Sequence, residues 1–254
     1  MILDLQKANV LKRLSAYIFD MIILFIIIAG VAFSLSAALD YDSKSDALDS
    51  IYKKYETEYG VSFDMSAEEY EKMTEAEKKN YENAAQAVVD DDEAQYLYGL
   101  LINITLIITT FSILTAYLIV DFLVPLLLKN GQTLGKRIFG IAVMRIDGVK
   151  ISAPILFIRT VLCKFTIETM IPVILVIMLI FGTLDITGAV VILLILGFQV
   201  VLICATKTNS AIHDTISGTV VVDMASQMIF DTPEALLEYK QRIHAESVER
   251  SEYR

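Results

Sequence analysis

The stretch Leu14–Leu39, LSAYIFDMIILFIIIAGVAFSLSAAL, decides the class of this protein, because it is a continuous apolar run with a single charged residue, Asp20. A helix of about 20 apolar residues spans the roughly 30 Å hydrocarbon core of a bilayer. In lipid only helices and closed barrels satisfy every backbone hydrogen bond, and this run is continuous rather than alternating. We therefore expect a transmembrane helix here. The run is longer than the roughly 7–15 apolar residues of a signal peptide, so we expect it to be retained.

Three further apolar runs follow, at Tyr96–Leu128, Val149–Gly182 and Gly188–Ala205. The chain is 55% hydrophobic, above the roughly 45–50% of soluble domains. These runs predict an all-α polytopic membrane protein with four transmembrane helices. The third run leaves two alternatives open: one long helix kinked near Pro172, or an interfacial helix followed by a span.

The polar segment between the first two runs accounts for the acidity of the chain. Residues 40–96 hold 17 acids and 6 bases. Two sequences in it, SAEE and TEAE, fit the capping box that begins a helix, and we expect helices near 43–59 and 74–89. The predicted parts are an N-terminal segment with the first span (1–39), an acidic extracytoplasmic helical insert (40–95), the remaining spans with a cytoplasmic loop (96–222) and a partly helical cytoplasmic tail (223–254).

Basic residues gather on one side of the predicted membrane. Seven bases and one acid lie between Lys129 and Lys164, and Lys7, Lys12 and Arg13 precede the first run. Short loops rich in Lys and Arg stay in the cytoplasm. We therefore predict a multi-pass protein of the cell membrane, with both termini and the loop after the second run in the cytoplasm.

That loop begins with NGQTLGKRIFGIAVMRIDG, Asn130–Gly148. It does not fit a phosphate-binding P-loop, since three rather than four residues separate Gly131 from Gly135 and Arg137 occupies the place of the magnesium-binding hydroxyl. Its glycines permit turns at the membrane surface. The segment RIFGIAVMRI alternates enough to form a short strand, and GTVVV near the C-terminus would pair with it in a small cytoplasmic β-element.

Three marked segments stand in order along the chain: RLSAYIFD with Arg13 and Asp20, GQTLGKRIFGIAVMRIDG with Gly131, Gly135 and Lys136, and IHDTISGTVVV with Asp214, Gly218 and Thr219. Together they resemble the RDD family of membrane proteins, which is named for one arginine and two aspartates. The resemblance covers about residues 10–38 and 97–222 and skips the insert. It implies a membrane-embedded chain and the transport of a ligand whose identity the family does not give.

Charged residues in or beside the apolar runs are the candidate site, because a charge in hydrocarbon is costly without a role. Arg13 and Asp20 are seven residues apart and share one helix face, about 10 Å apart along the axis. Asp214 returns to the same side of the membrane, so we expect these three residues to converge.

Arg159 and His213 are expected near this cluster, and Asp121 lies near the cytoplasmic end of the second run. The cluster is either a cation or proton site or a buried ion-pair network that only fixes helix packing. Lys164 and Glu168, four residues apart, are expected to neutralise each other on one helix.

Two functions stay open. One is transport of a small cation, or its exchange for protons, although four spans without an evident inverted repeat are few for a transporter unless it oligomerises. The other is an accessory membrane protein that binds or regulates a membrane partner through its insert. We expect no enzyme, cofactor, metal site or nucleic-acid partner, since the chain shows no catalytic motif and has only two histidines. The lipid bilayer is the expected surrounding, with a membrane protein or a second copy as possible partner.

Overall fold

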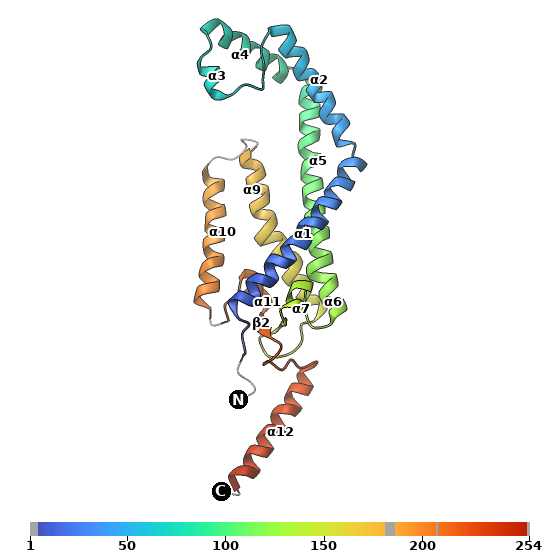
Figure 1. Cartoon of the computed structure of the whole chain (residues 1–254), viewed down its shortest axis with the longest axis vertical. Coiled ribbons are helices and arrows are strands. Elements are labelled where there is room, and N and C mark those ends of the chain that lie inside the picture. The colour runs from blue at the N-terminus through green and yellow to red at the C-terminus, as the bar shows by residue number, and fades with distance from the viewer. Residues whose placement is uncertain (1–4, 181–185, 207, 253–254) are drawn as a thin grey trace. The chain divides into compact units, whose positions relative to one another are not determined.

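Residues 5–180, 186–206 and 208–252 are described by the computed structural model of the chain. In this part of the chain four helices are long and apolar enough to cross a membrane: Val10–Ala38, Asp92–Leu128, Ala153–Ile180 and Ile186–Ala205 (Figure 1). The prediction of an all-α membrane fold with four such helices is confirmed. The end of the third predicted run, at residues 181–182, lies outside the described residues.

The first of these helices is α1 and the fourth is α10, and the other two change their winding along their length. The second consists of α5 (Asp92–Tyr117), the π-helix η1 (Leu118–Leu123) and α6 (Val124–Leu128); the third consists of α8 (Ala153–Phe157), the π-helix η2 (Ile158–Met170) and α9 (Ile171–Ile180). Within the described residues the third run is therefore one continuous helix, Ala153–Ile180, as in the first of the two alternatives, while the kink near Pro172 stays a prediction.

The helix η2 is wound more widely than an α-helix. A π-helix bonds residues five apart instead of four, and the hydroxyls of Thr166 and Thr169 donate to the carbonyls five residues earlier, of Val161 and Lys164. The predicted pair of Lys164 with Glu168 is wrong. Among the described residues these side chains bond to groups of other helices instead.

Two compact units make up the chain: a core unit of Met1–Ile28 with Ile113–Arg254, and an insert unit of Ala29–Ser112. The insert unit contains α2 (Tyr41–Tyr59), α3 (Ala67–Glu71) and α4 (Glu75–Val89). Both predicted capping boxes are formed, at Ser66 with Glu69 and at Thr74 with Glu77. The unit has its own apolar centre, built by Leu48, Val88, Ala94, Leu97 and Leu101.

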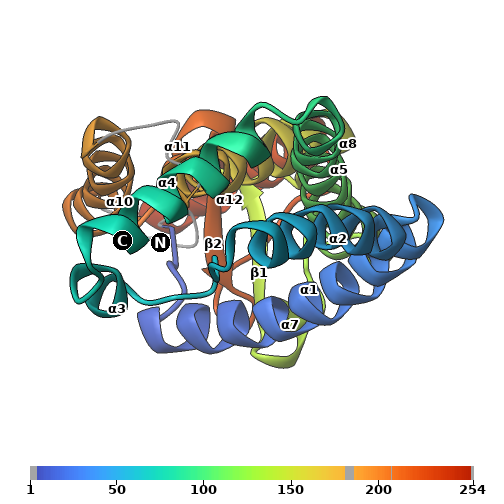
Figure 2. The same cartoon turned by 90° about the horizontal axis from the view of Figure 1, so that it is seen from above.

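The core unit contains a small antiparallel sheet, as predicted from RIFGIAVMRI and GTVVV. Strand β1 (Ile141–Arg145) pairs with β2 (Thr219–Asp223), with Val143 opposite Val221 (Figure 2). Short helices precede both strands, α7 (Leu134–Ile138) before β1 and α11 (Ile212–Ser217) before β2. The tail contains α12 (Pro233–Glu252).

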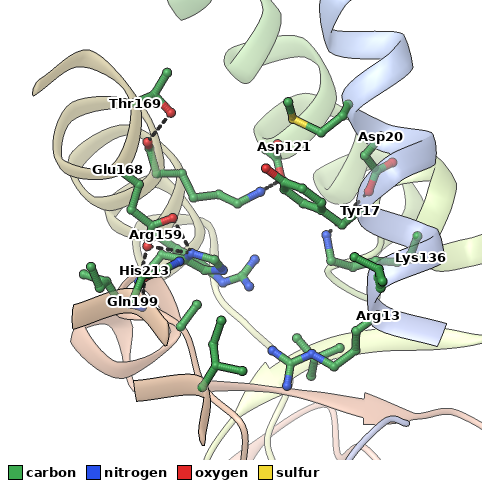
Figure 3. Close-up of a pocket in the computed structure, with 18 of the residues that line it drawn as sticks. Arg13, Tyr17, Asp20, Asp121, Lys136, Arg159, Glu168, Thr169, Gln199 and His213 are labelled. Carbon is green, nitrogen blue, oxygen red and sulfur yellow. Dashed lines mark hydrogen bonds and ion pairs between the residues drawn. The ribbon is translucent and has the colours of Figure 1, made fainter. Parts of the chain in front are cut away.

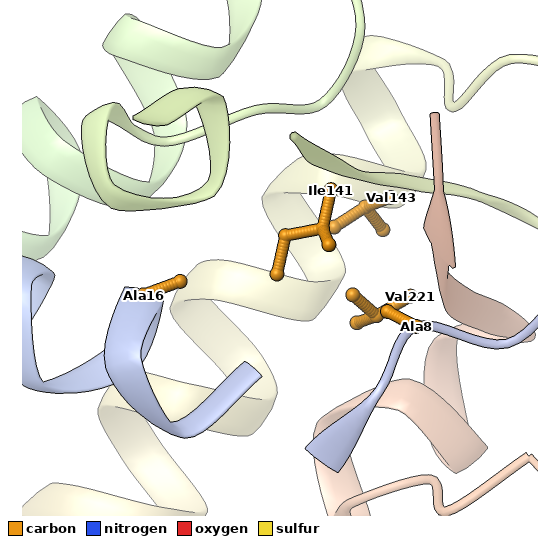
Figure 4. Close-up of a cluster of buried hydrophobic side chains, with 5 residues drawn as sticks. All are labelled: Ala8, Ala16, Ile141, Val143 and Val221. Atoms are coloured by element: carbon orange, nitrogen blue, oxygen red, sulfur yellow. The ribbon is translucent and has the colours of Figure 1, made fainter. Parts of the chain in front are cut away.

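One face of the sheet holds the N-terminal part of α1 in place. Ile141, Val143 and Val221 on this face form a buried apolar cluster with Ala8 and Ala16 (Figure 4). The backbone N–H of Ala8 also donates to the carbonyl of Val221 at 3.1 Å. The sheet thus fixes the beginning of α1, and with it the positions of the charged residues on that helix.

Candidate functional site

A cavity of about 470 Å³ opens within the core unit, between α1, the two π-helices, α10 and α11 (Figure 3). One part of its wall is apolar, formed by Val10, Leu14, Met21, Leu24, Ile195, Leu196 and Ile203. The other part is ionisable, formed by Arg13, Asp20, Asp121, Lys136, Arg159, Lys164, Glu168 and His213. The predicted ionisable residues therefore do converge, and three further ones, Lys136, Lys164 and Glu168, join them.

Asp20 is buried on α1 and is bound by the glycine-rich loop. Its carboxylate accepts the hydroxyl of Thr133 at 2.5 Å and the backbone N–H of Gly135 at 2.8 Å. Thr133 is also the N-cap of α7, since its hydroxyl accepts the N–H of Lys136. Asp20 and Arg13 share a face of α1, but the bonds to this carboxylate come from the loop, which the seven-residue spacing could not reveal.

Gly135 explains why the loop can approach α1 so closely. A Cβ atom at this position would meet the backbone carbonyl of Ala16 and lie 2.9 Å from Oδ1 of Asp20. Gly131 has a positive φ of 61° and makes the preceding turn beside β1. A Cβ atom at Gly131 would also lie 2.7 Å from the carbonyl oxygen of Val143, so Gly131 serves both a turn and close packing, and Gly135 serves close packing.

Asp214 is the partner of Arg13, and also of Arg159. Arg159 donates to Asp214 Oδ1 at 2.6 Å and Arg13 to Oδ2 at 3.3 Å. The hydroxyl of Thr219 donates to Oδ1 as well. Burial opposes the charge on Asp214, but the positive charges of Arg159 and Arg13 and the hydrogen bond from Arg159 hold the pKa of Asp214 well below its usual range. Asp214 is therefore ionised and fully engaged.

Gly218 and Thr219 place that cluster at the start of β2. Gly218 ends α11 with a φ of 62°, in the left-handed region that favours glycine. The chain then enters β2 directly, and the hydroxyl of Thr219 accepts a hydrogen bond from Arg159 at 3.2 Å. The family-like pair of residues thus joins the sheet to the arginine cluster.

Asp121 lies on η1 and bonds to Lys164 of η2 at 2.5 Å. Asp121 as a whole is 3% exposed. Its second oxygen, Oδ2, is buried and has no hydrogen-bond partner among the residues that the structure describes. An unsatisfied buried acceptor costs roughly 1–3 kcal/mol, more for a charged group, so this oxygen is the most incompletely satisfied polar atom of the cavity wall.

Glu168 and His213 form the side of the cavity next to α10. The ring nitrogen Nδ1 of His213 lies 2.9 Å from Glu168 Oε2, and the backbone N–H of His213 donates to Oε1 at 2.8 Å. Burial lowers the pKa of His213, an effect that Asp214 opposes and Arg159 reinforces. The ring is therefore neutral at pH 7. Because an ionised carboxylate only accepts hydrogen bonds, the proton of this neutral ring is on Nδ1.

Lys136 enters the cavity from α7. Its Nζ lies 3.1 Å from the hydroxyl of Thr133 and 3.8 Å from Asp20 Oδ2. Burial, and after it the charge of Lys164, lower the pKa of Lys136 to about 8 against the opposing effect of Asp121. This lysine can therefore gain and lose a proton near neutral pH.

Charge is balanced around the cavity. Four bases, Arg13, Lys136, Arg159 and Lys164, stand against four acids, Asp20, Asp121, Glu168 and Asp214. Within the described residues there is no cluster of three or more metal-binding side chains. The residues around the cavity thus include one buried carboxylate oxygen without a partner among the described residues, of Asp121, and one lysine, Lys136, whose charge can change near neutral pH.

The sequence could have pointed to Lys164 and Glu168 as site residues, since both interrupt an apolar run. It gave no signal for Thr133, whose role depends on its contact with a helix more than one hundred residues away in the chain.

The order of Arg13, Asp20, the glycine-rich loop and Asp214 agrees with a comparison of the whole chain with protein families. The model of the RDD family matches residues 7–218, which include both marked aspartates and the arginine. Searches of curated proteins and of solved structures give no match to the chain. Since the family model spans most of the chain, including all four long apolar helices, this protein belongs to the RDD family of membrane proteins.

Proposed function

We propose that this RDD family protein binds a small monovalent cation at the carboxylate of Asp121 and exchanges it for a proton across the membrane. The observation that carries the proposal is the buried Oδ2 of Asp121, which has no hydrogen-bond partner among the described residues and belongs to a residue of the cavity wall. Ionisable residues at membrane depth mark ion paths and proton relays. A cation or a proton at Oδ2 would satisfy this oxygen.

The chemistry around Asp121 supports a single rather than a double positive charge. Lys164 already neutralises the first oxygen of the carboxylate at 2.5 Å, and its positive charge repels a second cation by an energy that falls with distance and with the local dielectric. A divalent ion usually requires several carboxylates or carbonyl groups. A monovalent ion therefore fits the single free oxygen better.

The cavity lies toward the side of the spans on which the basic loop connects the second span to the third. Asp20 is near the beginning of α1, Asp121 near the end of the second span and Arg159 near the beginning of the third. The seven bases of Lys129–Lys164 favour a cytoplasmic position for this side. The proposed site would therefore be loaded from, or released to, the cytoplasm.

The test is transport by the purified protein in liposomes that contain a pH-sensitive dye. We expect an inward Na⁺, Li⁺ or K⁺ gradient to drive protons out of the liposomes with the wild-type chain. Asp121→Asn removes the charge of the candidate site and should abolish this movement, whereas the matched control Asp231→Asn, at an exposed aspartate paired with Lys150, should retain it.

Asp121→Asn leaves Lys164 buried without its carboxylate, which can destabilise a protein by about 3–5 kcal/mol. The double variant Asp121→Asn, Lys164→Gln removes both charges and should fold, yet still fail to move protons. Full ion-driven proton movement by a folded double variant would refute the site. If the wild-type chain itself moves no protons for any of the three ions, an accessory role becomes the better account of the protein.

A further inference from the structure

We infer that Lys136 is the group that carries the exchanged proton, and that one proton leaves for each cation bound, so that the exchange moves no net charge. The inference rests on the proposed function and adds to it the proton carrier and the stoichiometry. It comes from how differently the four bases of the cavity are held.

Lys136 is the base that a carboxylate holds least tightly. Arg13, Arg159 and Lys164 each donate a hydrogen bond to an aspartate, at 3.3, 2.6 and 2.5 Å. Lys136 is 3.8 Å from Asp20 and bonds only to the neutral hydroxyl of Thr133 among the described side chains. Each oxygen of Asp20 already accepts one hydrogen bond, from Thr133 and from Gly135, so this carboxylate is held by groups other than Lys136.

The neighbouring elements place charges of both signs around Lys136. The titratable or charged groups that line the cavity with it are Arg13, Tyr17 and Asp20 of α1, Tyr117 of α5, Asp121 of η1, Arg159, Lys164 and Glu168 of η2, and His213 of α11. Burial and the positive charges of Lys164 and Arg159 disfavour the ammonium form, and the carboxylates of Asp121 and Asp20 favour it. The resulting pKa of about 8 permits the lysine to change its charge near neutral pH.

Charge balance then fixes the stoichiometry. With Lys136 protonated and no ion bound, the four bases and four acids around the cavity cancel. A monovalent cation at Asp121 adds one buried positive charge, which is costly in a medium of low dielectric. Breaking one N–H bond of the Lys136 ammonium leaves the electron pair on Nζ and sends the proton to water. The total charge returns to zero, and the reverse step occurs when the cation leaves.

The experiment measures binding and proton release together, in a weakly buffered detergent solution with a pH indicator. NaCl is added at pH 7 and choline chloride serves as the ionic-strength control. For the wild-type chain we expect one proton released per Na⁺ bound. As the pH is raised toward 8, the apparent Na⁺ affinity should increase about tenfold for each pH unit. Above pH 8 it should level off, as linkage requires for one released proton.

Two variants of the lysine separate the proton from the charge. Lys136→Gln has no proton to lose, so it should bind Na⁺ without proton release and without a pH dependence near pH 8. Lys136→Arg keeps a permanent charge, so it should bind Na⁺ more weakly at every pH and release nothing. Lys129→Gln, at an exposed lysine of the same loop, should behave like the wild-type chain.

Each failure has its own signature. Proton release by Lys136→Gln equal to that of the wild-type chain would overturn the assignment of Lys136 and leave the cation site standing. A wild-type chain that binds no Na⁺, Li⁺ or K⁺ would refute the proposed function itself. In liposomes an imposed membrane potential should not change the exchange rate, and a clear acceleration by either sign of potential would exclude a one-for-one exchange.

Discussion

Asp214 joins two arginines that lie far apart in the sequence, and it is the residue on which we expect the core unit to depend most. Asp214→Asn would leave Arg159, which is 2% exposed, without its carboxylate. Removing one partner of a buried pair costs about 3–5 kcal/mol. We expect a correspondingly lower unfolding temperature in detergent. Asp147→Asn, which affects an exposed pair with Arg145, should change stability by no more than about 1 kcal/mol.

Asp20 would not compensate for such a loss, because it does not contact Arg13. An Arg13→Gln, Asp20→Asn double variant should therefore be no more stable than expected from the sum of its two single changes, within about 0.5 kcal/mol. Clear recovery of stability in the double variant would show that the two side chains interact after all.

Gly135 permits the closest approach of the loop to α1. In Gly135→Ala the new methyl group would collide with the backbone of Ala16, which cannot rotate away as a side chain can. Overpacking of this kind costs about 1–3 kcal/mol. Gly197→Ala on α10 is the control, since nothing lies within 4 Å of its new methyl group. Equal melting temperatures for the two variants would argue against close packing at Gly135.

At the scale of elements, the sheet and the π-helices position the site. The π-helices η1 and η2 carry Asp121 and Lys164, whose side chains meet across the two helices. Short π segments often occur at functional sites. The sheet positions α1. Its residues pack against the beginning of this helix, and β2, which follows the arginine cluster in the chain, bonds to the N-terminal segment at Ala8.

The register of the sheet can be tested by disulfide cross-linking. In a chain without Cys163 and Cys204, cysteines at the paired positions Val143 and Val221 should cross-link under mild oxidation, because directly opposite residues have Cβ atoms about 4.5–5.5 Å apart. Cysteines at Val143 and Val222 should cross-link far less, since neighbouring residues of a strand point to opposite faces. Gel mobility after cleavage between the strands measures the product, and the reverse preference would mean a register shifted by one residue.

At the scale of the whole molecule, charge along the chain predicts its orientation. In the same cysteine-free chain, a cysteine at the exposed position Ser62 of the insert should react with a membrane-impermeant thiol reagent in intact cells. A cysteine at Ser152, also exposed, should react only after the membrane is opened, because the seven bases of its loop favour the cytoplasm. The opposite labelling pattern would reverse the orientation and place the cavity on the outer side.

The sequence by itself determined the long apolar helices, the two capping boxes and the two short strands. Each of these depends on residues that are close together in the chain: an uninterrupted apolar run, a hydroxyl three residues before a carboxylate, or an alternating segment. The set of charged residues in the core was also largely visible, because each of them stands out in or beside an apolar run.

The tertiary structure alone decided which partner each charged residue bonds to. Asp20 bonds to Thr133, Arg13 to Asp214 and Asp121 to Lys164, over separations of 113, 201 and 43 residues. Helical spacing predicts contacts within one helix, yet these bonds form between elements whose approach depends on packing. At Gly135 the absence of a side chain lets the loop reach Asp20, and Lys164 and Glu168 of η2 find their partners on η1 and α11. The spacing of residues along the chain records neither the approach of the loop nor the packing of η2 against η1 and α11, so both are decided only by the tertiary structure.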